Sequence, residues 1–364
     1  MTSPDTGTTG KTYDIAGNVT GVTDAKGQTT VYQYDALNRV TQISYADGNF
    51  VTYQYDQGAN AVGRLSQVAD GSGSIKYAYD AGGRVTSETR MIGNVAYVTQ
   101  YGYDSIGRVA AVTYPSGRIL TYTRDALGRI SQIDTTKDGA TQTLVSQVIY
   151  RPFGGVQSFV NVANQTVTRS YDLQGRIAAF TLGSQTMAVG YDAASRISFI
   201  SDAANPVNTQ NFGYDALDRL TSYSGTGGSQ TLGYDATGNR TGKLVGTANT
   251  SYGIDAASNK LTQIAGSQNT TITTDANGSI TSNGNGQFTY DARGRMVAAN
   301  TALGPVTYTV NALGQRVAKT VQGATTVFHY DGAGKLIAES DGQGNVQKEY
   351  VYLGDIPVAL LQPQ

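Results

Sequence analysis

Apolar and polar residues alternate over short stretches of the chain, and turn-forming residues separate these stretches at regular distances. Val51, Tyr53 and Tyr55 would share one face of a strand, as would Ile43 and Tyr45 on another. Alternation with a period of two is typical of β-strands, whose successive side chains point to opposite faces. The alternation is imperfect, because Thr, Ser, Gln and Tyr occur on both faces. The pattern predicts a sheet one layer thick, both of whose faces are partly wetted.

An eight-residue motif, called the octet below, follows many of these predicted strands. It reads YDALNRVT from residue 34, YDAGGRVT from 79, YDSIGRVA from 103, YDLQGRIA from 171, YDAASRIS from 191 and YDALDRLT from 214. Counted on the position of its tyrosine, the octet occurs about every 21 residues, which is the signature of a repeat architecture. The sixteen copies are anchored at positions 13, 34, 55, 79, 103, 124, 150, 171, 191, 214, 234, 254, 274, 290, 310 and 330.

The octet predicts a hairpin turn. Its Asp carboxylate can accept hydrogen bonds from backbone N–H groups two residues further on. Its Gly, or Asn38 in the second copy, can adopt a positive φ at little cost. A type I turn followed by such a residue is a common hairpin connection. A looser turn, such as ADGN from residue 46, separates consecutive octets, so each repeat is expected to hold two strands and two turns.

The repeated side chains are expected to hold neighbouring repeats in register. The tyrosine rings would stack into a ladder, each Arg would lie on a neighbouring ring, and Asp and Arg would pair within a repeat or with the next one. The residues assigned to this structural motif are Tyr34, Asp35, Arg39, Tyr79, Asp80, Gly83, Arg84, Tyr103, Asp104, Gly107, Arg108, Tyr171, Asp172, Gly175, Arg176, Tyr214, Asp215 and Arg219.

Composition supports an all-β chain and excludes several kinds of chemistry. The 364 residues include 45 Gly and 25 Tyr but only 7 Pro, and 15% are charged. The absence of Cys excludes disulfides, thiolate catalysis and Cys-based zinc sites. A net charge of -1 without a basic stripe gives no indication of nucleic-acid binding, and no apolar stretch is long enough for a membrane helix.

No catalytic constellation is apparent in the sequence. The single His, His329, lies in a predicted strand without a marked Ser or acidic partner. The repeated Asp residues occur at turn starts, where capping explains them, and the DGSGS stretch from residue 70 lacks the spacing of a calcium loop. We therefore predict that the chain is not an enzyme and has no catalytic, cofactor-binding or metal-binding residues.

The pattern YDxxGR[VIL][TS], in sixteen tandem copies from Tyr13 onward, resembles the YD-repeat or Rhs-repeat family. That family includes bacterial Rhs polymorphic toxins, the B and C components of Tc toxin complexes, and animal teneurins. The resemblance implies a long β-sheet that spirals into a hollow shell. In the toxin members the shell encloses a C-terminal toxin segment, which a core with catalytic Asp residues releases. The stretch 329–362 looks like the last part before that core, which this sequence does not contain.

These observations predict an all-β fold of tandem YD-repeat hairpins in a single-layer, spiralling antiparallel sheet, an open β-shell or hollow barrel segment. Residues 1–12 would be a disordered or extended tail, 13–353 one β-shell domain of sixteen repeats, and 354–364 an extension leading toward the absent core. The N-terminal residues lack the pattern of a signal peptide, so a secreted or cell-surface location would need another route.

The predicted function is a non-catalytic structural shell that encloses or scaffolds a toxin or client polypeptide. One alternative is a glycan-binding surface adhesin. Its candidate binding positions would be the irregular copies around Arg151–Phe153 and Ile254–Asn259. A further alternative is a subunit of a self-assembling extracellular filament. The expected partners are accordingly an enclosed client, further copies of the chain at open sheet edges, or glycans, with no nucleic acid, no membrane insertion and no cofactor.

Overall fold

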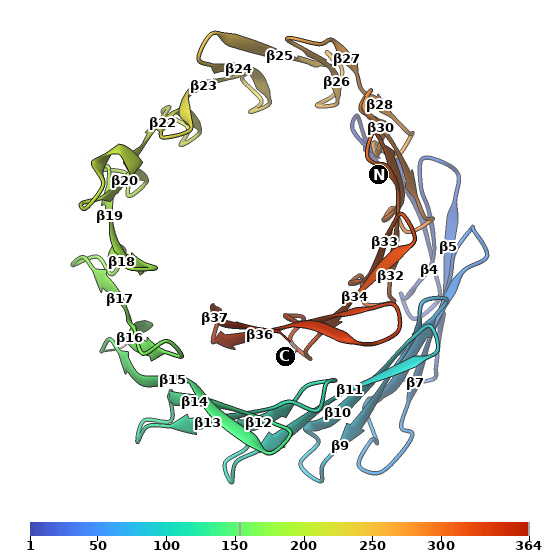
Figure 1. Cartoon of the computed structure of the whole chain (residues 1–364). Coiled ribbons are helices and arrows are strands. Elements are labelled where there is room, and N and C mark those ends of the chain that lie inside the picture. The colour runs from blue at the N-terminus through green and yellow to red at the C-terminus, as the bar shows by residue number, and fades with distance from the viewer. Residues whose placement is uncertain (153, 363–364) are drawn as a thin grey trace. The chain divides into compact units, whose positions relative to one another are not determined.

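The computed structural model describes residues 1–152 and 154–362, and almost all regular structure in these ranges is β-strand (Figure 1). A single 3-10 turn, η1 (Pro206–Asn208), accompanies 37 strands in this described part. The chain divides into two compact units. Unit 1 comprises Met1–Leu144 and Thr274–Gln364, and unit 2 comprises Val145–Thr273. No helix in the described ranges is long and apolar enough to cross a membrane.

Besides the short pair of β1 (Thr2–Ser3) and β2 (Gly7–Thr8), unit 1 contains two large antiparallel sheets in which each strand pairs with the next along the chain. The N-terminal sheet consists of β3 (Gly10–Tyr13), β4 (Val19–Thr23), β5 (Thr29–Tyr34), β6 (Val40–Ser44), β7 (Phe50–Tyr55), β8 (Leu65–Asp70), β9 (Gly73–Tyr79), β10 (Val85–Ile92), β11 (Val95–Tyr103), β12 (Val109–Thr113), β13 (Ile119–Arg124) and β14 (Ile130–Lys137). The C-terminal sheet consists of β28 (Thr273–Thr274), β29 (Ile280–Ser282), β30 (Gly286–Tyr290), β31 (Met296–Thr301), β32 (Gly304–Val310), β33 (Arg316–Val321), β34 (Ala324–Tyr330), β35 (Leu336–Asp341), β36 (Val346–Leu353) and β37 (Ile356–Leu361).

Unit 2 is one antiparallel sheet with the same strand-to-next-strand pairing. The boundary between the units falls within β15 (Ala140–Tyr150). The strands that follow are β16 (Val156–Asn161), β17 (Thr166–Tyr171), β18 (Ile177–Leu182), β19 (Gln185–Tyr191), β20 (Ile197–Asp202), β21 (Gln210–Tyr214), β22 (Leu220–Gly225), β23 (Gly228–Tyr234), β24 (Arg240–Val245), β25 (Ala248–Ile254), β26 (Leu261–Ala265) and β27 (Thr270–Thr271).

The octets form the hairpin turns that the sequence predicts. In the copy that starts at Tyr34, the Asp35 amide donates to the Arg39 carbonyl at 2.9 Å and the Asn38 amide donates to the Asp35 carbonyl at 3.0 Å. Asn38 has φ 59° and occupies the left-handed position. The strand register shifts between Gln33 and Tyr34. A tight turn followed by such a bulge joins two twisted strands without splaying them.

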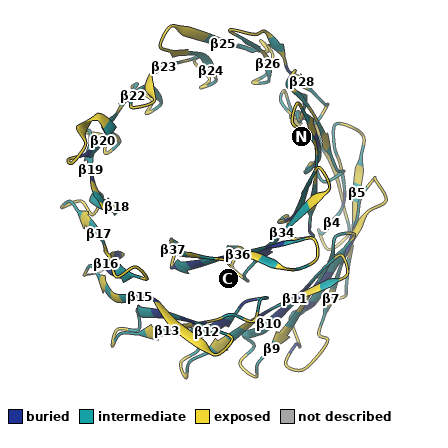
Figure 2. Ribbon diagram, viewed as in Figure 1, coloured by how far each residue is buried: buried dark blue, intermediate teal, exposed yellow. Residues whose placement is uncertain are grey.

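In unit 1 the C-terminal sheet lies against one face of the N-terminal sheet (Figure 1). Val51, Val68 and Ile75 of the N-terminal sheet form a buried cluster against which Ala312 packs. Further along, the Tyr114 hydroxyl donates to the Tyr350 carbonyl at 2.8 Å. Figure 2 shows the buried residues concentrated in these two sheets. The core of unit 1 therefore lies between two layers.

The all-β fold of tandem antiparallel hairpins is thus confirmed, but the expected single layer holds for the described residues of unit 2 and not for unit 1. Local alternation reveals which face a side chain takes, whereas stacking of two sheets depends on contacts between distant segments. Residues 1–12, predicted as a tail, contain β1 (Thr2–Ser3), β2 (Gly7–Thr8) and most of β3, and the predicted extension 354–364 contributes β37.

Candidate functional site

In the regular octets, an Asp and an Arg four residues apart meet within one turn. Asp35 Oδ1 accepts hydrogen bonds from the backbone N–H groups of Leu37 and Arg39, both at 2.9 Å, and its Oδ2 accepts one from Arg39 Nε at 2.7 Å. The hydrogen bond from the Arg39 amide is the main cause that lowers the pKa of Asp35 below its usual value. The corresponding Arg Nε to Asp Oδ2 distances are 2.6 to 2.7 Å at Asp80 with Arg84, Asp104 with Arg108, Asp172 with Arg176, and Asp215 with Arg219.

Each predicted glycine takes the left-handed position of its turn. Gly83, Gly107 and Gly175 have φ values of 80°, 88° and 82°. A side chain at such a φ is strained, and a Cβ on Gly107 would also lie 2.9 Å from Arg84 Nη1. The turn geometry therefore favours Gly at this place in the octet.

The repeated tyrosines link each repeat to the one before it. The Tyr34 hydroxyl donates to the Val19 carbonyl at 2.8 Å, fifteen residues back. In the copy at position 124, Arg124 replaces the tyrosine, and its Nη2 donates to the Val109 carbonyl at 2.8 Å. The other predicted tyrosines repeat this bond at 2.6 to 2.9 Å, namely Tyr79 to Leu65, Tyr103 to Val85, Tyr171 to Val156 and Tyr214 to Ile197.

The tyrosine rings do not form the expected ring-on-ring ladder. Among the described residues, the two ring pairs are Tyr97 with His329 and Phe212 with Tyr223, and neither joins two octet tyrosines. Instead, the octet Arg lies over the ring of the next repeat, and its guanidinium takes the space that a second ring would need. The distances to the ring centroid are 4.3 Å for Arg39 over Tyr55, 4.6 Å for Arg84 over Tyr103, 4.2 Å for Arg176 over Tyr191 and 4.8 Å for Arg219 over Tyr234.

The octet residues thus contact their own turn and the neighbouring repeat. Some ion pairs also cross between repeats, as Arg39 Nη2 lies 2.7 Å from Asp56 Oδ2. In the irregular copy at position 150, the Arg151 guanidinium lies 4.2 Å from the Tyr171 ring centroid, and Phe153 lies outside the described residues. We predict that these contacts stabilise the fold.

Charged side chains that the sequence did not single out lie buried between the two sheets of unit 1. Arg90 Nη2 is 2.8 Å from Glu88 Oε2, and the two side chains are only 5% and 3% exposed. Arg90 Nη1 also donates to Gln315 Oε1 of the other sheet at 2.8 Å. Arg118 Nε is 2.5 Å from Glu349 Oε2, again between the sheets. Burial of such charges is tolerated when they are paired and hydrogen-bonded.

His329 of β34 is buried in the same layer. Its Nε2 is 2.9 Å from Ser340 Oγ, and its ring centroid is 4.2 Å from that of Tyr97. Burial lowers the pKa of His329 to about 4, so the imidazole is neutral at physiological pH. Within the described part of the chain, no group of metal-ligating side chains is found.

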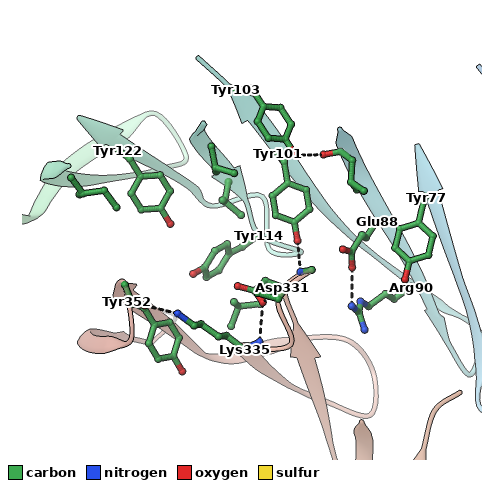
Figure 3. Close-up of a pocket in the computed structure, with 18 of the residues that line it drawn as sticks. Tyr77, Glu88, Arg90, Tyr101, Tyr103, Tyr114, Tyr122, Asp331, Lys335 and Tyr352 are labelled. Atoms are coloured by element: carbon green, nitrogen blue, oxygen red, sulfur yellow. Dashed lines mark hydrogen bonds and ion pairs between the residues drawn. The ribbon is translucent and has the colours of Figure 1, made fainter. Parts of the chain in front are cut away.

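A cavity of about 500 Å³ lies between the N-terminal and C-terminal sheets of unit 1 (Figure 3). Tyrosines from β9, β11, β13 and β36, with Tyr114 from the turn after β12, form much of its wall. Burial raises the pKa of Tyr122 to about 12 and that of Tyr101 further still. These hydroxyls are therefore neutral, and the cavity is an aromatic chamber with a few polar groups.

Two octets, those anchored at positions 310 and 330, contribute turn residues to this cavity, and both lack the usual Arg. Asp331 Oδ1 accepts hydrogen bonds from the Ala333 and Lys335 amides at 2.9 and 2.8 Å, as in other octets. Lys335 stands where most copies have Arg, and its Nζ bonds instead to the Gly354 carbonyl at 2.5 Å and to Asp355 Oδ1 at 2.8 Å. Among the described residues, nothing donates to Asp331 Oδ2.

The repeat pattern of the sequence does not predict this cavity. Its tyrosines come from segments more than 200 residues apart, and only the stacking of the two sheets brings them together. Two local signals could have drawn attention to it. Tyr97, Tyr101 and Tyr103 crowd one strand, and Lys335 breaks the Asp–Arg rule of the octet.

Sequence families match most of the chain. A family described as RHS Repeat matches residues 13–49, 60–90 and 97–141, and one described as Teneurin YD-shell matches residues 206–353. Among curated proteins, the tRNA nuclease WapA of Bacillus subtilis (strain 168) is 37% identical over 87 residues, which are 22% of this chain and 4% of WapA. The tRNA3(Ser)-specific nuclease WapA of Bacillus spizizenii is 36% identical over a stretch of the same length. The chain thus spans only a small part of these relatives.

Solved structures with a similar fold are Tc toxin proteins. One is a Tc holotoxin pore of Photorhabdus luminescens with a substitution in TccC3. The match covers 100% of this chain and 24% of the toxin chain, with a TM-score of 0.78 and 14% identity. The crystal structure of TcdB2-TccC3 matches 100% of this chain and 25% of that chain, with a TM-score of 0.70 and 14% identity.

The fold, the octets and the family matches together define a class of protein. Its members are built from tandem β-hairpins, and Tyr, Asp and Arg side chains link one hairpin to the next. Within that class, the chain belongs to the YD-repeat, or Rhs-repeat, family.

Proposed function

We propose that the chain is a non-catalytic structural wall that encloses or scaffolds a toxin or client polypeptide. The observation that carries this proposal is the linkage between consecutive repeats. A regular octet bonds back through its Tyr hydroxyl and forward through its Arg guanidinium, as Tyr171 does to Val156 and Arg176 does to Tyr191. Side chains used in this way build a continuous sheet and are not presented to a substrate.

The relatives support a structural role. The fold is similar to that of Tc toxin proteins along the whole chain. The curated nucleases match only 4% of their own length, so their tRNA cleavage is not assigned to this chain. We further propose that the protein acts outside the cell or at its surface, where a shell of this kind would carry its client.

Enclosure can be tested with a reporter segment. The same unstructured, protease-sensitive segment is fused after Gln364 in one protein and before Met1 in another, and its cleavage by a dilute protease is followed by mass spectrometry. If the chain forms a wall around a client, one of the two segments is protected while the other is digested quickly. A denatured sample of each fusion provides the unprotected rate. Digestion of both segments at that rate would contradict enclosure by this chain.

A further inference from the structure

The cavity between the two sheets of unit 1 has rigid aromatic walls. The Tyr101 hydroxyl accepts a hydrogen bond from the Gly332 amide at 2.7 Å, and the Tyr114 hydroxyl donates to the Tyr350 carbonyl at 2.8 Å. The Tyr352 hydroxyl donates to the Leu336 carbonyl at 2.9 Å. These bonds fix the three rings around the chamber (Figure 3). Aromatic rings held in place before binding attract organic cations through their electron-rich faces.

Two hydroxyls on the wall remain available. Within the described part of the chain, neither Tyr77 nor Tyr122 has a hydrogen-bond partner for its hydroxyl, although both line the cavity. Neither hydroxyl oxygen is fully buried, so both are open to the cavity. These two groups could therefore accept hydrogen bonds from an N–H donor inside the chamber.

Two charged side chains of the cavity wall, Asp331 and Arg124, have no oppositely charged partner among the described residues. Glu88 is paired with Arg90, and Lys335 with Asp355. Arg124 is held by the carbonyls of Val109 and Gly128, at 2.8 and 3.2 Å. Among the described residues, Asp331 is the carboxylate of the lining that has no cationic partner. The same Asp331 lies near enough to Tyr114 and Tyr122 to raise the pKa of both, although burial is the larger cause.

We propose that this cavity binds an organic cation, an alkylammonium or guanidinium group on an apolar stem, with the charge beside Asp331 and against the rings of Tyr114 and Tyr122. The cavity is large enough for such a group, since ligand pockets generally hold a few hundred Å³. A desolvated cation needs a counter-charge, which the carboxylate supplies. Valine and isoleucine side chains on the wall, such as Val112 and Ile337, would contact the stem. A free amine and the side chain of a Lys or Arg in a polypeptide share this chemistry.

Titration calorimetry on the full chain tests the proposal with matched probes. Phenethylamine carries the cation, and phenethyl alcohol is its neutral analogue of nearly equal shape. A capped Gly-Arg-Gly peptide represents a polypeptide source. We expect saturable binding of phenethylamine, of the peptide, or of both, at least about tenfold tighter than binding of the alcohol. Binding by the amine alone would identify a small-molecule site, and binding by the peptide would identify a polypeptide side chain as the source.

Three variants locate the charge. Asp331→Asn removes it but keeps the turn, because Asn311 caps its own octet through Oδ1 in the same way, with the Leu313 and Gln315 amides at 3.0 and 2.9 Å. Lys335→Arg restores the usual octet, so the new Arg would reach Asp331 Oδ2 and neutralise it without removing any charge. Both changes should weaken amine binding by at least about tenfold. The matched control, Asp341→Asn, removes the same charge from the next turn, which lies outside the cavity, and should leave binding unchanged.

Three results would overturn the proposal. One is the absence of saturable binding by both cationic probes to the folded wild-type chain. Another is equal affinity for amine and alcohol, which would show that the chamber is merely apolar. A third is wild-type affinity in Lys335→Arg, whose folding is checked by its melting temperature. None of these results depends on whether the chain encloses a client.

Discussion

The two units are built from the same repeat, yet the described part of unit 1 has two packed layers and that of unit 2 has one. In unit 1 the C-terminal sheet covers a face of the N-terminal sheet, and Val51, Ile75 and Leu120 are buried there. In unit 2 the described strands form one sheet, and large apolar side chains such as Leu182 and Phe199 remain exposed. The octet therefore determines how a hairpin is made, and the strand residues outside it determine whether a second layer can be added.

One position of the repeat contributes to this difference. The residue four places before the octet tyrosine is apolar and buried in three copies of unit 1, at Val51, Ile75 and Leu120, although other copies of that unit have Thr or Gly there. In unit 2 the same position is polar at residues 210, 230 and 250. It is apolar at Val167, which is half-buried, and at Met187, which is buried. Apolar side chains at this position let two sheets pack, because burial of apolar area is what stabilises the contact.

The largest effect is expected where a buried ion pair joins the layers. Glu349→Ala should lower the free energy of unfolding by about 3 to 5 kcal/mol, since it leaves the largely buried Arg118 without its anionic partner. Urea denaturation measures the change. Asp355→Ala, which breaks an exposed pair with Lys335, should cost less than about 1 kcal/mol. Equal losses in the two variants would show that the layers are not closely packed at Glu349.

Acid should weaken unit 1 through His329. Its pKa is about 4 in the folded chain against 6.5 as the ordinary value, so the unfolded chain binds more protons between these values. The stabilisation is fully present above pH 6.5 and is lost as the pH falls toward 4, which amounts to about 3 kcal/mol at most. His329→Gln should flatten the dependence of stability on pH in this window. Parallel curves for the two proteins would contradict the burial of a neutral imidazole.

A pair of identical substitutions compares the two units directly. Val51→Ala in unit 1 should cost about 2 kcal/mol, because Val51 is only 1% exposed and its removal leaves a cavity. Val167→Ala, at the same position of the repeat in unit 2, should cost less than about 1 kcal/mol. Denaturation midpoints of both variants give the comparison. A larger loss for Val167 would mean that unit 2 is covered by another layer.

The last prediction concerns the octet turn, which both units share. Gly107→Val should destabilise by more than about 1 kcal/mol, since a β-branched residue is strained at φ 88°. Gly227→Val is the control, because Gly227 does not have a positive φ and has open space around it. A neutral shift in melting temperature for Gly107→Val would contradict the geometry of the octet.

The sequence predicts the hairpins well because their causes are local. Asp35, Asn38 and Arg39 lie within five residues, and turn chemistry alone brings them together. The second layer could not be predicted in this way. Arg118 and Glu349 are 231 residues apart, and the octets are too alike to specify which repeats stack. The cavity depends on that stacking, so the role that we propose for Asp331 could not be inferred from the sequence.

Hydrogen exchange followed by mass spectrometry tests the central claim most directly, namely that one repeated hairpin builds both a covered sheet and an uncovered sheet. Under native conditions, amides of β12 and β13 in unit 1 should exchange at least about tenfold more slowly than those of β17 and β18 in unit 2, because local opening is easier where fewer apolar contacts are lost. Equal protection across the four strands, or greater protection in unit 2, would contradict this account.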